Sequence, residues 1–207
     1  MNRYSELNEN ACGILMEIGN IGTGNAVTSL SQMLDRPIDM ECPDVRIMEF
    51  NEVPGMLGGI EEVRVGVLLE ITGDIRGIFM FLSSAPFLKV MLEGLLGMEV
   101  EDITCLDPMS MSAVSEIGNI MCCSYINALT RMLDIKVDVS VPDTCVDMIG
   151  AILSVPMIHF ANISDELLMI EDKYHFGDLS VISHVLFLPE IESLEQIFRA
   201  LGEEYEK

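Results

Sequence analysis

The spacing of the hydrophobic positions predicts two long helices. Between about residues 7 and 34, apolar side chains recur at the three- to four-residue spacing of one helix face: Ile14, Ile18, Ile21 and Val27. A second helix is predicted for about residues 107–133, because Asp107-Pro108 resembles a helix start, with an Asp N-cap and Pro in the first turn. Each helix would open one half of the chain.

Each half also contains a predicted β-hairpin. Segments rich in Val, Ile, Leu and Phe flank a Gly-Asp dipeptide, a common turn between antiparallel strands. The predicted strands cover residues 63–72, 75–83, 167–176 and 179–188. A shorter helix follows each hairpin, over residues 85–96 and 190–201, and a Gly after each is a stop signal. The pattern predicts an α+β fold, with the long helices covering one face of a mainly antiparallel sheet.

The two halves are copies of one another. A constant shift of 99 residues places ILMEIGNIGTGNAVTSLSQMLDRPIDMECPD on AVSEIGNIMCCSYINALTRMLDIKVDVSVPD without a gap. Such a dense match indicates a duplication. We therefore expect one domain over residues 1–207, made of two repeats at about 7–97 and 106–203 and related by a pseudo-twofold axis. The second closing helix is displaced by about 105 residues, so an insertion is expected near residues 146–160, forming an additional helix before Pro156.

The polar residues that both repeats keep are a glutamate and an asparagine. Glu17 and Glu116 are the only charged side chains of residues 10–34 and 108–130, and neither has a Lys or Arg three or four residues away. Asn20 and Asn119 follow at three residues, which places each amide on the same helix face as the carboxylate. Ser112 extends the row in the second repeat. The row is either a presented polar site or a solvated helix stripe whose Asn caps or bends the helix.

Several kinds of chemistry fit these residues poorly. Each helix offers one acid, so a pair of carboxylates facing one sugar is not expected, and a Ser triad has no His before His159. The glycines at positions 19, 22 and 24 lack the order of a phosphate-binding loop. An amide can instead orient a water, and a carboxylate can bind a Lys of a partner. Such a pair would act as a helper beside a site that already holds a metal and a phosphoryl group.

The composition limits the classes of molecule that the chain can bind. Thirty-four acidic against eleven basic residues give a net charge of −23, which would repel nucleic acid and an anionic bilayer. The acids either keep an apolar, Met-rich chain soluble or meet a basic partner, and the two roles are compatible. The most apolar stretch, residues 148–163, is too short and too broken by Pro156 to span a membrane. Six cysteines without a CxxC pair, three histidines without ligand spacing and a polar start favour the cytoplasm and no zinc site.

These residues resemble the CheC family of chemotaxis phosphatases, which is related to CheX and FliY. The family motif is Asp or Ser, three residues, Glu, two residues, Asn, twenty-two residues and Pro. The second repeat matches all of it, at Ser112, Glu116, Asn119 and Pro142. The first repeat matches at Glu17, Asn20 and Pro43 but carries Gly13 where Asp or Ser is expected, so that site lacks the supporting hydroxyl or carboxylate.

The resemblance implies hydrolysis of the aspartyl phosphate of the response regulator CheY. Asn20 and Asn119 would orient the attacking water, and Glu17 and Glu116 would pair with a lysine of the docked CheY. The Mg²⁺ would be supplied by CheY, so no cofactor of the chain's own is expected.

The family also implies a partner, the receptor-modifying deamidase CheD. The asymmetric segment at about residues 147–155, with Asp147, is a candidate docking helix for CheD or else an extra core helix. The main alternative function is a non-catalytic module that sequesters phosphorylated CheY or regulates CheD. A structural part of the flagellar switch would require an oligomerising domain that the sequence does not show.

Overall fold

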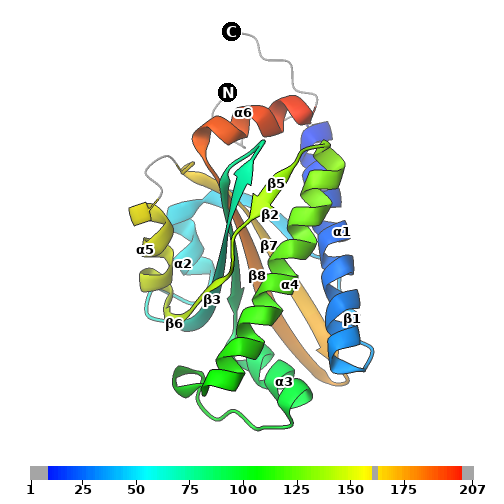
Figure 1. Ribbon diagram of the computed structural model, residues 1–207, viewed down its shortest axis with the longest axis vertical. Coiled ribbons are helices and arrows are strands. Elements are labelled where there is room, and N and C mark those ends of the chain that lie inside the picture. Colours follow the sequence, from blue (N-terminus) through cyan, green and yellow to red (C-terminus); the bar gives the residue numbers. More distant parts are fainter. Residues whose placement is uncertain (1–8, 160–162, 202–207) are drawn as a thin grey trace.

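Two long helices cover one face of a β-sheet in the computed structural model, which describes residues 9–159 and 163–201. Helices α1 (Glu9–Leu34) and α4 (Pro108–Leu133) are each 26 residues long and pack side by side (Figure 1). The shorter helices α3 (Ala85–Leu96) and α6 (Ile191–Ala200) lie at opposite ends of the sheet (Figure 1). The predicted α+β fold is confirmed.

Within the described residues, eight strands form one antiparallel sheet. They are β1 (Asp39–Met40), β2 (Asp44–Glu49), β3 (Val63–Gly73), β4 (Gly77–Ser83), β5 (Val137–Val139), β6 (Asp143–Met148), β7 (Glu166–Phe176) and β8 (Leu179–Pro189). The order along the sheet is β1-β7-β8-β4-β3-β5, with β2 also paired to β7 and β6 also paired to β3. The two predicted hairpins, β3-β4 and β7-β8, are present and meet through β4 and β8 at its centre.

The two repeats exchange their edge strands. Strand β2 of the first half pairs with β7 of the second, and β6 of the second half pairs with β3 of the first. Each long helix is therefore followed by a strand that completes the other half's hairpin. At the centre, the rings of Phe79 on β4 and Phe187 on β8 stack with centroids 4.5 Å apart. Neither half has its full set of strand partners without the other.

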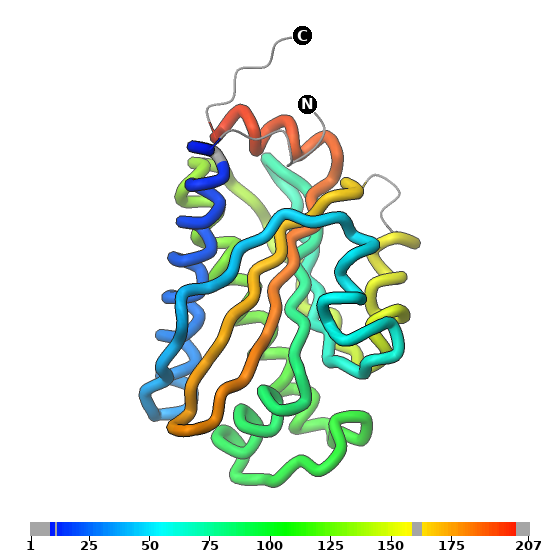
Figure 2. The backbone as a smooth tube through the Cα atoms, turned by 180° about the vertical axis from the view of Figure 1, so that it is seen from behind, coloured from blue at the N-terminus to red at the C-terminus, as the bar shows by residue number. Residues whose placement is uncertain are grey.

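Apolar side chains fill both faces of the sheet. The larger cluster lies between the sheet and α1, α4, α3 and α6. The smaller cluster lies on the opposite face, under η2 (Phe50–Glu52), α2 (Val53–Met56) and α5 (Ile149–His159), which Figure 2 shows from behind. Burial of this area supplies most of the favourable free energy of folding. The long helices are thus fixed along their whole inner face, which gives their outer residues a rigid support.

Helix α5 differs from the prediction in two respects. It continues through Pro156 to His159, and its counterpart in the first half is η2 with α2, so the insertion lengthens an element that both repeats possess. A Pro inside a helix removes one backbone hydrogen bond. That loss is offset here because Ile149, Ile152 and Leu153 are buried against the sheet. The expectation that the helix would end before Pro156 was wrong.

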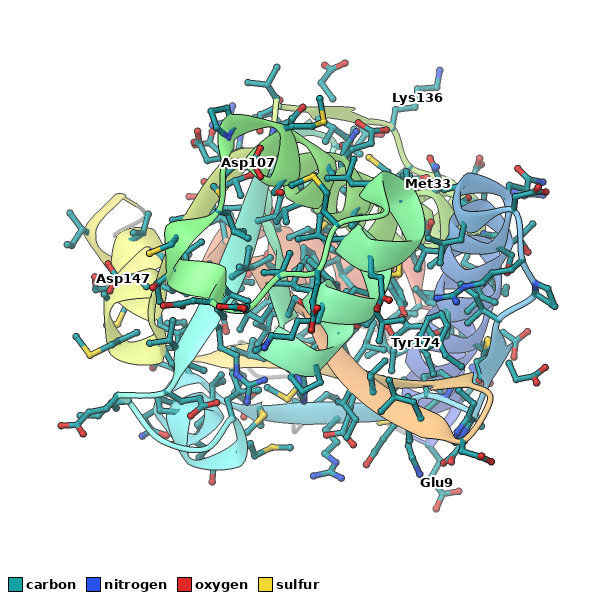
Figure 3. All side chains as sticks on the ribbon, turned by 90° about the horizontal axis from the view of Figure 1, so that it is seen from below. Glu9, Met33, Asp107, Lys136, Asp147 and Tyr174 are labelled. Carbon is teal, nitrogen blue, oxygen red and sulfur yellow. The ribbon has the colours of Figure 1, made fainter. Side chains whose placement is uncertain are left out.

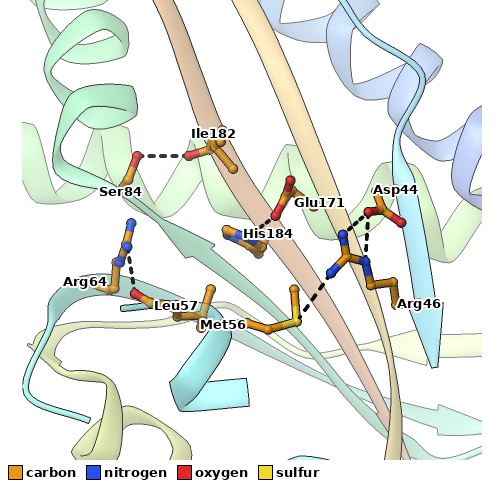
Figure 4. A network of polar contacts seen from close by, with 9 residues as sticks. All are labelled: Asp44, Arg46, Met56, Leu57, Arg64, Ser84, Glu171, Ile182 and His184. Carbon is orange, nitrogen blue, oxygen red and sulfur yellow. Dashed lines mark hydrogen bonds and ion pairs between the residues drawn. The ribbon is translucent and has the colours of Figure 1, made fainter. Parts of the chain in front are cut away.

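A half-buried arginine of β3 holds the end of α2 against the sheet. The Arg64 guanidinium donates to the carbonyl oxygen of Leu57, just past α2, across 2.9 Å (Figure 4). Beside it, the buried His184 imidazole lies 3.2 Å from the carboxylate of Glu171 (Figure 4). Burial lowers the pKa of His184, although Glu171 opposes that shift. Arg64 thus links the end of α2 to β3, although its buried Nε has no hydrogen-bond partner among the described residues.

Within residues 9–159 and 163–201, no helix combines the length and the hydropathy needed to cross a bilayer.

Candidate functional site

The two Glu-Asn pairs lie on the accessible sides of the long helices. Glu17 on α1 and Glu116 on α4 are exposed, and Asn20 and Asn119 are half-buried. Each carboxylate is three residues before its amide, on one helix face. The predicted pairs are therefore accessible from solvent.

The local sequence turns each pair away from the sheet. Both pairs lie in the sequence Glu-Ile-Gly-Asn, in which Ile18 and Ile117 are buried. A Cβ on Gly118 would lie 2.4 Å from Cβ of Val67 on β3, and Gly19 packs as closely on β2. Only glycine allows this approach, so the helix backbone rests on the strand at this point. The flanking Glu and Asn are consequently directed off the sheet.

A cysteine thiol donates a hydrogen bond to each asparagine. Cys42 Sγ lies 3.2 Å from Oδ1 of Asn20, and Cys123 Sγ lies 3.4 Å from Oδ1 of Asn119. The two thiols occupy different places in the repeats, because Cys42 precedes β2 whereas Cys123 lies one helical turn after its asparagine. The sequence-based prediction missed both contacts. The signals that could have found them are the four-residue spacing from Asn119 and the position next to Pro43.

The second thiol is held in its protonated form. Burial raises the pKa of Cys123, and the carboxylate of Glu116 raises it further. A thiol that keeps its hydrogen can donate to a carbonyl oxygen, whereas a thiolate would repel it. The amide oxygen of Asn119 thus accepts from the thiol, and its NH₂ group remains available for other hydrogen bonds.

The supporting positions of the motif are not equivalent in the two repeats. Ser112 is exposed one turn before Glu116, and a Cβ on Gly13, its counterpart, would meet no atom within 4 Å. No steric reason therefore requires glycine at position 13. Pro43 is buried immediately before β2, and Pro142 is half-buried immediately before β6. Both prolines restrict the backbone where the chain enters a strand that packs beside a long helix.

Asp147 lies apart from the Glu-Asn pairs. It is exposed on β6, whereas the prediction placed it in a helix, and its carboxylate accepts from the backbone N–H of Met148 across 2.7 Å. Figure 3 shows Asp147 beside α5, on the side of the molecule away from α1. A cleft of about 500 Å³ lies nearby between η2 and α5, lined among others by Phe50, Gly150 and Leu153. The sheet separates this region from the outer faces of the long helices.

A buried polar network joins the two site-bearing helices to the sheet. The carboxylate of Asp172 on β7 accepts from Thr23 of α1 across 2.8 Å and from Tyr125 of α4 across 2.5 Å. A Cβ on Gly22 would lie 2.2 Å from the Tyr125 ring, so this glycine makes room for the tyrosine between the helices. Burial raises the pKa of Asp172 to about 6, even though the hydroxyl donors lower it. The network fixes α1 and α4 relative to one another beneath the two pairs.

The chemistry that this arrangement can perform is limited. In the part of the chain that the structure describes, no three His, Cys, Asp or Glu side chains come together as a metal site. A carboxylate and an amide on the convex face of a helix cannot enclose a small molecule. They can contact a protein that docks on the helix, with the carboxylate binding a cation and the amide orienting a water.

Comparison with known proteins is consistent with this geometry. The model of the CheC-like family matches residues 11–47 and 109–145, the two segments that carry the pairs. Over 210 residues the chain is 32% identical to the CheY-P phosphatase CheC of Bacillus subtilis, covering 98% of this chain and 99% of that protein.

Solved structures share the fold. The crystal structure of Thermotoga maritima FliY matches with a TM-score of 0.71 and 23% identity, covering 95% of this chain and 98% of that one. The FliM middle domain from H. pylori matches with a TM-score of 0.64 and 9% identity, covering 94% and 99%. At these identities the likeness extends to the fold alone.

Proposed function

The chain belongs to the CheC-like family, and on that premise we propose that it is a phosphatase acting on the aspartyl phosphate of the chemotaxis response regulator CheY. Similarity over nearly the full length to a protein named CheY-P phosphatase supports the proposal. The observation that carries it is the accessibility of two Glu-Asn pairs on neighbouring helices, because a helper amide must reach into its partner's site. The place of action would be the cytoplasm, together with the substrate.

In this proposal Asn20 and Asn119 orient the attacking water. An amide side chain donates and accepts hydrogen bonds at the same time, so it can hold a water in one direction. Phosphoryl transfer depends mainly on placing the nucleophile in line beside a metal that neutralises charge. The Mg²⁺ belongs to the phosphorylated CheY and is part of the substrate, so the chain requires no cofactor of its own.

The remaining residues of the motif set the docking geometry. Glu17 and Glu116 each lie one turn before the amide, and pairing with a lysine of CheY would fix the distance between amide and phosphorus. Ser112 adds a hydroxyl to the second site, and Gly13 leaves the first site without one. Pro43 and Pro142 support the backbone beside each helix.

Phosphate release from phosphorylated CheY tests the proposal. Removing one positioned donor typically costs about 10²- to 10³-fold in rate. Asn119→Ala should lower the rate of the second site by that factor, and Asn20→Ala should do the same at the first. The matched controls are Asn127→Ala on α4 and Asn25→Ala on α1, both exposed, which should leave the rate unchanged. Full activity with Asn20 and Asn119 both replaced would refute the assignment.

A second candidate is a binding module that sequesters phosphorylated CheY or regulates CheD without turnover. The fold supports this alternative, because a FliM middle domain and a chain from the structure of a FliG-FliM complex share it. Excess phosphorylated CheY separates the two functions. A phosphatase releases many phosphates per chain, whereas a sequestering module releases none beyond the rate of CheY alone.

We further propose that the surface around Asp147 and α5 binds CheD. Asp147, Val155, Met157 and Ile158 are exposed there, and residues 149–158 of α5 carry no charged side chain, so the helix presents an apolar surface to the solvent. Replacing Val155 and Met157 by Asp should abolish CheD binding and leave phosphate release without CheD unchanged. Retained CheD binding would show that this helix only completes the core.

A further inference from the structure

The asparagines of the two sites each accept a hydrogen bond from a thiol, although the thiols come from different positions of the repeat. The counterpart of Cys42 in the second repeat is Val141, which is 82% exposed, and the counterpart of Cys123 in the first repeat is Gly24. In the first half Cys42 contacts Asn20, and in the second half Cys123 contacts Asn119. Neither half has a cysteine at the position that the other half uses. A duplication that changed both positions kept the same contact.

The contact selects one of two orientations of the amide. A thiol donates weakly and accepts weakly, so the orientation with Oδ1 toward Sγ–H leaves the Nδ2 hydrogens directed away from the sulfur. Without the thiol, the terminal amide torsion is broad and roughly two-fold, and χ1 has two common staggered wells in a helix. A half-buried Asn on a helix surface has few other contacts to select among them.

We propose that Cys42 and Cys123 are positioning residues, which orient Asn20 and Asn119 for the phosphatase reaction through these hydrogen bonds. The inference rests on the proposed function, since it assigns the thiols a part in the same reaction. The two thiols differ in accessibility. Cys42 is exposed, whereas Cys123 is half-buried. The first site is therefore sensitive to thiol modification, and the second site is protected.

The first site is tested with the second one inactivated by Asn119→Ala. In that background Cys42→Ala should lower kcat by roughly two- to four-fold, the number of amide orientations that become accessible in a helix, and should change KM less than two-fold. Cys42→Ser, which supplies an O–H donor, should restore at least half of the lost rate. Cys105→Ala, which removes another exposed thiol, is the control and should have no effect. An unchanged kcat, or a serine variant no better than alanine, would overturn the inference.

The second site is tested in the reciprocal way. With Asn20→Ala in place, Cys123→Ala should lower kcat and Cys123→Ser should restore it. Iodoacetamide, which replaces the S–H hydrogen and releases iodide, should inactivate the first site faster than the second. The Cys42→Ser chain should resist that inactivation at the first site. Equal rates of inactivation at both sites would contradict the difference in accessibility.

A readout without turnover separates this inference from the proposed function. NMR reports both torsions of Asn20: three-bond couplings give χ1, and nuclear Overhauser effects from the Nδ2 hydrogens give the direction of the amide. Both should indicate one orientation in the unmodified chain and averaging in Cys42→Ala. If neither signal changes, the positioning role is overturned even if the phosphatase activity is as proposed. If the chain lacks phosphatase activity, the NMR result still decides whether the thiol orients the amide.

Discussion

The buried carboxyl of Asp172 should make the free energy of unfolding depend on pH, and Asp172→Asn should remove that dependence. Its carboxyl is fully buried among Thr23 and Tyr125, and burial raises its pKa to about 6. An unfolded chain has an Asp pKa near 3.9. Because the folded state binds the proton more tightly, the stabilising contribution is complete below about pH 4 and is lost as the pH rises through 6. We expect the substitution Asp172→Asn to remove this dependence.

The magnitude follows from the pKa difference. Two pKa units correspond to about 3 kcal/mol over the whole pH range. Roughly half of this stabilising contribution is already lost at pH 5. About 1 kcal/mol of it therefore remains to be lost between pH 5 and 7.5. That window stays above the sequence pI of about 4.1, which avoids precipitation. The free energy of unfolding of the unmodified chain, minus that of Asp172→Asn, should therefore fall by about 1 kcal/mol from pH 5 to 7.5.

Urea unfolding followed by circular dichroism measures this difference. Asp178→Asn is the matched control, since Asp178 is exposed in the turn between β7 and β8 and its variant should follow the unmodified chain at every pH. Taking the difference between the free energies of unfolding of the unmodified chain and of Asp172→Asn cancels the contribution of the other acidic residues. Parallel pH profiles for the unmodified chain and Asp172→Asn, or a difference that grows with pH, would refute the reasoning.

Three further substitutions test how the long helices pack and how Glu116 acts. Gly118→Ala places a Cβ 2.4 Å from Val67, so it should destabilise the fold by about 1–3 kcal/mol in urea unfolding. Gly13→Ala, whose new Cβ meets nothing within 4 Å, should stabilise the helix by up to about 1 kcal/mol. A Gly118→Ala chain more stable than the Gly13→Ala chain would contradict the packing described. Glu116→Lys, measured in a chain that also carries Asn20→Ala, should raise the KM for phosphorylated CheY more than it lowers kcat. The same reversal at exposed Glu93 on α3 should change neither, and an effect confined to kcat would exclude a docking role.

The sequence predicts local features of this chain well. The two long helices, the hairpins and the closing helices follow from spacing and turn residues, which depend on neighbours in the chain. The Glu-Ile-Gly-Asn repeat identified the exposed pairs, because buried isoleucine and close-packed glycine fix which way the helix faces. The continuation of α5 past Pro156 was missed, since its stability comes from burial against the sheet and not from the local sequence.

The sequence did not predict which distant segments of the chain contact one another. A duplicated chain can pair β2 with the hairpin of either half, and both choices satisfy the same hydrophobic pattern. Asp172 lies between Glu171 and Lys173 in what resembles an exposed stretch. The alternation of β7 places it on the same face as Ile170 and Tyr174, and that was the available signal. The contact of Cys42 with Asn20 depends on how the segment before β2 passes α1, which no spacing in one segment reveals, whereas Cys123 follows Asn119 by four residues within α4.

The most direct test of the account is phosphate release from phosphorylated CheY by the chain with both Asn20 and Asn119 replaced by Ala, compared with the chain in which Asn25 and Asn127 are replaced. We expect the first variant to fold normally and to release phosphate no faster than CheY alone, and the second to match the unmodified chain. Undiminished release by the first variant would contradict the claim that two presented amides carry out the reaction.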